Sequence, residues 1–257
     1  MRLLAVESST PAASVAIIEW DGVADGRLPS ERVCLIRLEP GRPQTESLLE
    51  AVDQVLAETG CVVRELDGFA ASVGPGAFIG VRVGIATVKG LAMGADKPVV
   101  PVSTLEGLAC RALEPQILDA ACVEASSDAA SRLTVCPMID ARRGEVYAAK
   151  FRPDHGRTQV VREGEAVLSS PEPLLEKLND TVLFLGDGAR LHRSMIIRRL
   201  GSRALFPSSA LPELMEPSAA AVARLAARRW RQGRTIDPGE LTAVYLRPAV
   251  EQPAAQR

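Results

Sequence analysis

A glycine-rich loop between an apolar strand and an amphipathic helix is the feature that most restricts the fold of this 257-residue chain. Residues 67–73 have the continuous apolar pattern of a buried strand, and Gly74-Pro75-Gly76 follows as a loop. Helical periodicity returns over residues 80–94, and residues 99–102 form the next apolar run. A strand, a helix and a second strand in this order predict a parallel α/β unit.

The remaining periodic segments extend this unit into a larger α/β protein. Consecutive short strands near the N-terminus predict an antiparallel start, and the chain beyond residue 131 predicts a hairpin. No internal repeat is evident, and aromatic residues make up only 4% of the chain, so we expect an aliphatic core. The other predicted strands span residues 3–6, 14–18, 33–38, 133–139, 145–151 and 182–185, and the other predicted helices span 48–56 and 218–231.

The composition restricts the class of function. A net charge of -2 and a pI of about 5.9 do not support a strongly basic surface for nucleic acid. The five cysteines are odd in number and contain no CxxC pair, so neither a disulfide framework nor a zinc site is expected. No signal-peptide pattern opens the chain and no apolar stretch reaches ~18 residues, so we expect a cytoplasmic protein without a membrane span.

The glycine loop has two interpretations. Backbone amides at the start of a helix can hold an anion, so Glu7, Ser8, Gly74 and Gly76 are candidates for a phosphate or nucleotide loop. The segment lacks Gly-Lys-Ser/Thr, and its glycines are spaced one residue longer than a dinucleotide fingerprint. The alternative is a tight strand–helix turn that requires positive φ angles.

Glycines also interrupt the helix that follows the loop. Gly80 and Gly84 are four residues apart, as are Gly90 and Gly94, and each glycine destabilises a helix by roughly 0.5–1 kcal/mol relative to alanine. Close approach of another helix, from this chain or from a partner, would offset that cost. Arg82 stands near the start of the helix, against the dipole, so we expect either an anionic partner or a side chain extended into solvent.

Four segments together resemble the TsaB (YeaZ) family. The loop and helix resemble its pattern GPGSFTGxRIGxA, with Ala77 and Ile79 in place of two hydroxyl residues. The chain also has Glu7 where the family usually has Asp, and Gln44 where it often has His. The resembling segments are LLAVESS at residues 3–9, GPGAFIGVRVGIA at 74–86, MIDARRGEVY at 138–147 and VYLR at 244–247.

The resemblance implies an actin-like ATPase (ASKHA) fold. This is an α/β architecture of two lobes, each with a mixed central sheet flanked by helices. We expect an N-terminal actin-like lobe over residues 1–110 and a C-terminal lobe over residues 111–247. Residues 111–131 would be an inter-lobe insertion, and residues 248–257 would be a disordered tail.

The resemblance also implies a non-catalytic subunit of the tRNA threonylcarbamoyladenosine synthesis complex. Such a subunit binds and stabilises a TsaD-like transferase that modifies the adenosine next to the tRNA anticodon. A TsaE-like ATPase would complete the complex, tRNA would bind through the complex, and the chain alone would form a homodimer. It would require no cofactor of its own, with ATP or ADP possible in the complex. The expected partner interface is Leu48, Val52, Val55, Gly80, Arg82, Gly84 and Val88.

The positions of the histidines argue against catalysis by this chain. In the catalytic TsaD relatives, HMEGH follows the strand after the glycine loop, and two histidines at i and i+4 can share a metal ion. Thr104 and Leu108 occupy this register here. The two histidines of the chain, His155 and His192, stand in unrelated contexts. We therefore assign no catalytic residue and no metal ligand.

Two enzyme classes remain as alternatives. One is a stand-alone actin-like-fold nucleotide hydrolase that uses Glu7 and the loop from Gly74 to Gly76. The other is a metallopeptidase-like "glycoprotease", against which the missing histidine pair argues. Both predict activity without a partner. In addition, arginines at positions 224, 228 and 231 of the predicted last helix could meet tRNA phosphates or form a solvated helix face.

Overall fold

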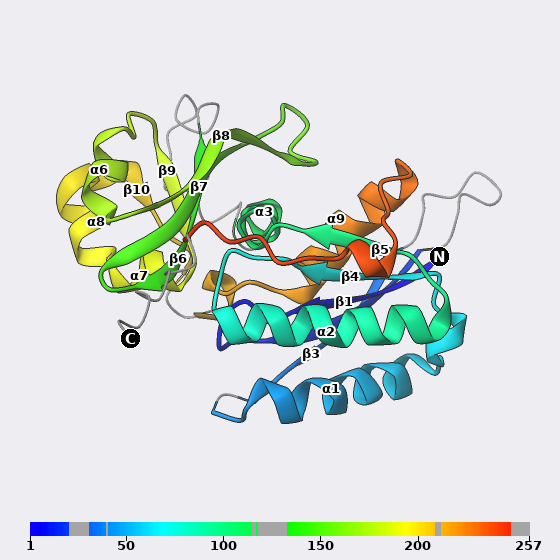
Figure 1. Ribbon diagram of the computed structural model, residues 1–257. Helices are drawn as coiled ribbons and strands as arrows, with labels where there is room; N and C mark the ends of the chain where they lie inside the picture. The colour runs from blue at the N-terminus through cyan, green and yellow to red at the C-terminus, as the bar shows by residue number, and fades with distance from the viewer. Residues whose placement is uncertain (21–30, 40, 115–116, 118–132, 209–211, 248–257) are drawn as a thin grey trace, which may run out of the picture.

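Two five-stranded sheets, each covered by helices, form the two lobes of the computed structural model (Figure 1). The structure describes residues 1–20, 31–39, 41–114, 117, 133–208 and 212–247. Most of the expected insertion at 111–131 and the whole expected tail at 248–257 lie outside these residues. The prediction of an α/β protein with two lobes and mixed central sheets is confirmed.

The first sheet is the core of the N-terminal lobe. Its elements are β1 (Arg2–Glu7), β2 (Ser14–Trp20), β3 (Glu31–Arg37), α1 (Gln44–Thr59), β4 (Gly68–Ser72), α2 (Phe78–Ala95), β5 (Val99–Val102) and the later helix α9 (Ala219–Arg231). The strand order is β3-β2-β1-β4-β5, with the first three antiparallel as predicted and β4 and β5 parallel to β1. Successive side chains of a strand point to opposite faces, so Leu4 and Val6 pack with α1 and α2, whereas Leu3 and Ala5 pack with α9.

The second sheet repeats the topology of the first. Its elements are β6 (Thr134–Arg142), β7 (Glu145–Pro153), β8 (Val160–Ser169), α6 (Pro171–Glu176), β9 (Val182–Leu185), α7 (Asp187–Leu191), α8 (Arg193–Leu200) and β10 (Ala204–Leu205). The order β8-β7-β6-β9-β10 again places two antiparallel strands on one side of the first strand and two parallel strands on the other. The sequence shows no repeat, so this duplication is visible only in the fold.

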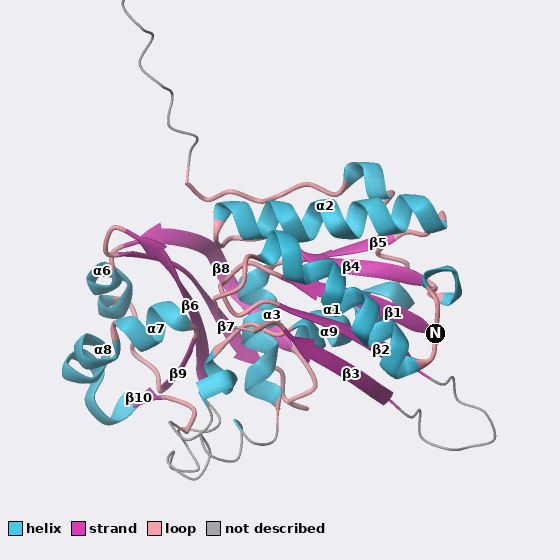
Figure 2. Cartoon of the chain, turned by 90° about the horizontal axis from the view of Figure 1, so that it is seen from below, coloured by secondary structure: helices cyan, strands magenta, loops and turns pink. Residues whose placement is uncertain are grey.

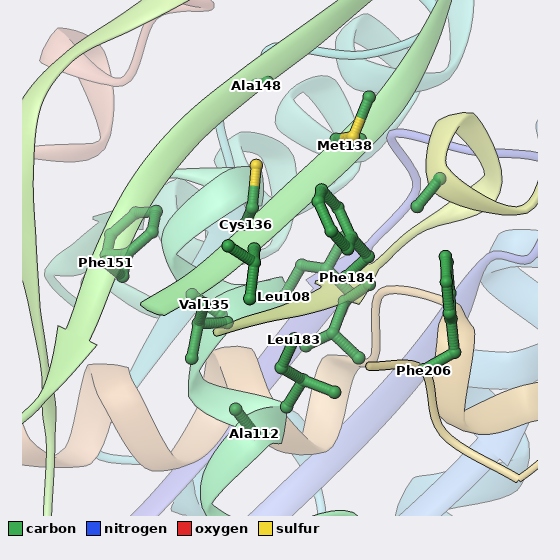
Figure 3. Packing of buried hydrophobic residues seen from close by; sticks show 14 of the residues in the cluster. Leu108, Ala112, Val135, Cys136, Met138, Ala148, Phe151, Leu183, Phe184 and Phe206 are labelled. Atoms are coloured by element: carbon green, nitrogen blue, oxygen red, sulfur yellow. The ribbon is translucent and has the colours of Figure 1, made fainter. Parts of the chain in front are cut away.

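The core of the second lobe is mainly aliphatic, as predicted, with a few large aromatic rings (Figure 3). Phe184 and Phe206 stack with their ring centroids 5.6 Å apart, and Phe151 is buried nearby. Leu108 of α3 (Thr104–Cys110) reaches into the same cluster. This helix also contacts α9, so it lies between the two lobes, as Figure 2 shows.

Helix α9 returns the chain to the first lobe, which differs from the expected boundary. We expected residues 111–247 to form the second lobe, but α9 packs on β1 and β2. Its alanines and Val222 are buried against the sheet face opposite α1 and α2. The side chain of Ser14 accepts a hydrogen bond from Ala219 N at 2.9 Å, which fixes the start of the helix. The first sheet needs this cover because both of its faces are apolar.

Among the described residues, one helix has the length and apolar composition of a membrane span. This is α2, with 18 residues and a mean hydropathy of 1.4, so the expectation that no apolar stretch reaches this length is wrong. The helix packs Val81, Ile85 and Val88 into the core of the first lobe. At least one apolar face of α2 is therefore buried in the interior of the lobe.

Two of the glycines in α2 allow close approach of the connection between β1 and β2. A Cβ atom at Gly80 would overlap the carbonyl oxygen of Ser8, and one at Gly84 would overlap Ser8 Oγ. The Ser8 hydroxyl also donates a hydrogen bond to Gly80 O at 2.9 Å. Close approach of another helix was predicted, but its main source is this connection, and helix α1 contributes only the side chain of Gln44, its first residue, near Gly80. At Gly90 and Gly94, no atom of the described residues lies within 4 Å of an added Cβ.

The two kinds of glycine should respond oppositely to alanine. We expect Gly80→Ala to lower the free energy of unfolding by about 1–3 kcal/mol, because the new methyl group overlaps buried backbone. We expect Gly90→Ala to raise it by roughly 0.5–1 kcal/mol through helix propensity alone. Urea denaturation of both variants checks this, and a destabilised Gly90→Ala would contradict the open environment seen at that position.

Candidate functional site

A cavity of about 530 Å³ lies between the two lobes. Its walls come from the connection after β1, the start of α2, the β6–β7 hairpin, the start of α7 and the C-terminal segment, which we define as residues 241–247. Aromatic and charged side chains face each other across it. Those that line it include Ser9, Thr10, Phe78, Arg82, Asp140, Tyr147, Asp187, Tyr245 and Arg247.

The C-terminal segment ties the two lobes together beside this cavity (Figure 1). Val244 N donates to the carbonyl oxygen of Val73, just before the glycine loop, at 2.8 Å. Arg247 pairs with Glu145 of the hairpin in the second lobe at 2.5 Å. The VYLR motif therefore has a structural role that the sequence alone did not assign, because its partners are distant in the chain.

The guanidinium group of Arg82 is held by two aromatic rings. It lies 3.6 Å from the centroid of the Phe78 ring, and its Nε donates to the Tyr245 hydroxyl at 2.7 Å. The two rings are themselves 5.6 Å apart between centroids. No carboxylate of the described residues lies within 4.0 Å of Arg82, so the predicted anionic partner is not found within this part of the chain.

The candidate nucleotide loop is closed by the chain itself. Glu7 is 1% exposed, and its Oε1 accepts hydrogen bonds from Ser9 N at 2.7 Å and Ser9 Oγ at 2.5 Å. Gly74 has a φ of +100°, and a Cβ there would lie 2.8 Å from Val244 O. Of the four candidates, only Gly76 lines the cavity, because Glu7, Ser8 and Gly74 are buried beneath it. This geometry favours the interpretation as a tight strand–helix turn.

Two carboxylates of the second lobe line the cavity. Asp187 Oδ1 accepts hydrogen bonds from Asp140 N at 3.0 Å and from Gly188 N at 2.8 Å. Burial raises the pKa of Asp187 above its ordinary value, although these hydrogen bonds oppose the rise. Asp140 forms an ion pair with Arg142 at 3.1 Å, which stabilises the hairpin. Sequence reasoning missed Asp187, although its place directly after the apolar run 182–185 was a usable signal.

Most of the expected partner interface lies inside the protein. Leu48, Val52, Val55 and Val88 belong to the core of the first lobe, where α1 and α2 cover the sheet. Gly80 and Gly84 are covered by Ser8. The assignment of these six residues to a partner surface is therefore wrong, since an apolar stripe on a helix serves a core as well as an interface. Arg82 is exposed.

The residues in the metal-binding register of the catalytic relatives lie in the interior. Thr104 and Leu108, both on α3, are 0% exposed. Within the described part of the chain, no group of three or more His, Cys, Asp and Glu side chains is placed to hold a metal ion.

Two of the arginines of α9 make contacts within the first lobe. Arg224 pairs with Glu31 at 2.6 Å. Arg231 stacks over the Trp20 ring, 3.6 Å from its centroid. These contacts join α9 to β2 and β3, which favours a structural role for the two arginines over a tRNA-binding role.

Glu7 should make stability depend on pH. Burial raises the pKa of its carboxyl above the ordinary value of 4.5, and the hydrogen bonds from Ser9 only partly oppose this. The folded state then keeps this proton to a higher pH than the unfolded state. The stabilisation is present below pH 4.5 and is lost as the pH rises through the raised pKa.

We therefore expect Glu7→Gln to gain stability relative to the native chain as the pH rises from about 4 to about 8. Urea denaturation at several pH values measures the difference between the two proteins. Glu165→Gln, at a carboxylate on the surface of β8, is the control. A difference that does not change with pH would show that the pKa of Glu7 is the same in the folded and unfolded states, which would contradict the raised pKa.

Comparison with known proteins agrees with this architecture. Residues 41–229 match the family described as TsaD, tRNA N6-adenosine threonylcarbamoyltransferase. The chain is 30% identical to the tRNA threonylcarbamoyladenosine biosynthesis protein TsaB of Haemophilus influenzae, covering 97% of this chain and 95% of that protein. It is 31% identical to the protein of the same name from Escherichia coli, covering 96% and 95%.

A solved structure shows the same fold. It is a protein with similarity to peptidase YEAZ from Pseudomonas aeruginosa, 29% identical to this chain. The superposition covers 96% of this chain and 99% of that one, with a TM-score of 0.73. The matches to these TsaB proteins extend over both lobes of the chain, which therefore belongs to the TsaB (YeaZ) family.

Proposed function

We propose that this chain is a non-catalytic subunit in the synthesis of threonylcarbamoyladenosine in tRNA, and that it binds and stabilises a TsaD-like transferase. The relatives from Haemophilus influenzae and Escherichia coli, which are named for threonylcarbamoyladenosine biosynthesis, support this pathway. The observation that carries the binding role is the outward face of α2, which no described part of the chain covers.

This outward face combines large apolar and very small residues. Ile79 is 70% exposed and Met93 is 64% exposed. Ala86 and Gly90 stand between them on the same side of the helix, at spacings of three to seven residues. Each internal glycine destabilises the helix by roughly 0.5–1 kcal/mol. No described residue packs against a Cβ position at Gly90, so a helix of a partner that approaches closely here would supply the offsetting contact.

Helix α1 extends the same surface. It lies beside α2 in the layer below the first sheet (Figure 1). Its inner residues cover the sheet, whereas Leu49 is 55% exposed. Two adjacent helices with outward apolar positions present a surface suited to a pair of helices from a second protein.

The residues of the chain support an accessory role over a catalytic one. Thr104 and Leu108 replace the two histidines of the catalytic relatives, and neither side chain can take the place of an imidazole ligand. The stand-alone nucleotide hydrolase is disfavoured because Glu7 and Gly74 are buried and packed by the chain itself.

The other members of the assembly follow from the family. We propose that the chain acts in the cytoplasm with a TsaE-like ATPase, and that tRNA is bound through the complex. Without its partner, the outward face of α2 would associate with a second copy of the chain, because burial of exposed apolar surface favours association. ATP or ADP in the complex remains a prediction that follows from the resemblance alone.

Blocking the outward face of α2 should abolish the complex without harming the fold. We expect Gly90→Arg to fold normally, because an added Cβ meets no atom of the described residues within 4 Å and arginine favours helix more than glycine does. The same side chain would prevent a partner helix from approaching. Size-exclusion chromatography of each variant with the TsaD-like protein of the same organism measures complex formation.

Gly156→Arg is the matched control, since it adds the same side chain to the turn between β7 and β8 in the second lobe. We expect this variant to form the complex like the native chain. A native chain that forms no complex but hydrolyses ATP, with loss of turnover in Glu7→Ala, would overturn the proposed function.

A further inference from the structure

Arg82 is a fixed positive charge at the start of the outward face of α2. Its contacts with Phe78 and Tyr245 hold the guanidinium in one place, so little rotamer entropy remains to be lost when it binds a ligand. Its Nε is occupied by the Tyr245 hydroxyl, whereas its two Nη groups have no hydrogen-bond partner among the described residues. These two groups form the end of the fork that binds a planar oxyanion with two parallel hydrogen bonds.

The residues near Arg82 are of the kind that become buried when a protein complex forms. Four large apolar residues near it each expose 48% or more of their surface: Phe78 at 55%, Ile79 at 70%, Val244 at 50% and Tyr245 at 48%. They come from two segments about 160 residues apart that meet at this point. A ring of apolar contacts that excludes water around a central arginine is typical of the residues that dominate binding energy.

Arg193 and Arg231 also stack on aromatic rings, but those rings, Phe206 and Trp20, are less exposed than Phe78 and Tyr245. Several other arginines of the described chain are neutralised by a carboxylate. Arg142, Arg224 and Arg247, for example, each form an ion pair with a carboxylate of the chain at 3.1 Å or less. Arg82 has aromatic neighbours in place of a carboxylate, and it stands where the helix dipole favours a negative charge. The counter-ion of Arg82 is therefore expected to come from another molecule.

We propose that Arg82 binds the carboxylate of an Asp or Glu side chain on the partner protein, with Tyr245 as its positioning residue. This inference rests on the proposed function, since the partner is the TsaD-like transferase. Arg142 and Arg247 line the same cavity, but each is already paired with a carboxylate of the chain. A carboxylate is favoured over a nucleic-acid phosphate because Arg82 is then a single cation without an ion pair among the described residues, whereas phosphate backbones are bound by several cations. The site is continuous with the outward face of α2 through Ile79.

The test is the affinity of the full-length chain for the TsaD-like protein, measured by isothermal titration calorimetry. We expect Arg82→Gln to weaken binding by about thirtyfold, the loss typical of a central interface arginine. Arg82→Lys keeps the charge but not the fork, so it should recover only part of the affinity. Tyr245→Phe should weaken binding less than Arg82→Gln, because it frees the guanidinium without removing it. The control is Arg162→Gln, which removes an exposed arginine from β8 of the second lobe.

The outcomes separate this inference from the proposed function. Equal binding by the native chain and Arg82→Gln overturns the inference and leaves the proposed function intact. No binding by the native chain overturns both. If Arg82→Gln binds the transferase normally but the assembled complex loses affinity for tRNA, then Arg82 contacts phosphate and the carboxylate proposal is wrong. Restored binding between Arg82→Glu and a partner variant with Arg at one acidic position identifies the carboxylate directly.

Discussion

The contact between Ser8 and the start of α2 determines the position of that helix, and much of the structure depends on it. Gly80 and Gly84 let the helix backbone reach Ser8, and the Ser8 hydroxyl joins them through a hydrogen bond of 2.9 Å. The same approach brings Ala77 N to the carbonyl oxygen of Ser9 at 2.7 Å. A backbone amide that an anion could use at this helix start is thus satisfied by the chain. The glycine loop therefore packs the start of α2 against the connection after β1, at the edge of the cavity.

Because its inner side is occupied in this way, α2 divides its residues between two roles. Gly80 and Gly84 pack in the interior, whereas Gly90 and Gly94 are exposed and have no atom of the described chain within 4 Å of an added Cβ. The sequence shows the same four-residue spacing in both pairs and cannot distinguish them. The C-terminal segment then completes the outward face at its beginning, where Tyr245 meets Arg82. The start of α2 therefore lines the cavity between the lobes and also begins the outward surface that is suited to a partner.

Sequence reasoning succeeded where the signal is short-range. The antiparallel opening strands, the β6–β7 hairpin and the strand at 182–185 were predicted because the period of apolar residues fixes them locally. The errors concern contacts between distant residues. The hydrogen bond from Ala219 N to Ser14 spans 205 positions, and nothing local reveals that α9 covers the first sheet. Likewise, Leu48 and Val88 have the pattern of an interface, and only their burial beneath the sheet shows that they are core.

A difference between the two duplicated halves explains why the proposed partner surface lies on the first lobe. In each lobe a glycine with positive φ stands within two residues of the end of the fourth strand, +100° at Gly74 and +105° at Gly186, and a helix follows. In the first lobe that helix is α2, which runs for 18 residues and extends across the face of its sheet. In the second lobe the corresponding helix, α7, has 5 residues and is followed at once by α8. Only a long, straight helix can present residues from Ile79 to Met93 along one line, so the two halves share a topology but differ in what they offer to another protein.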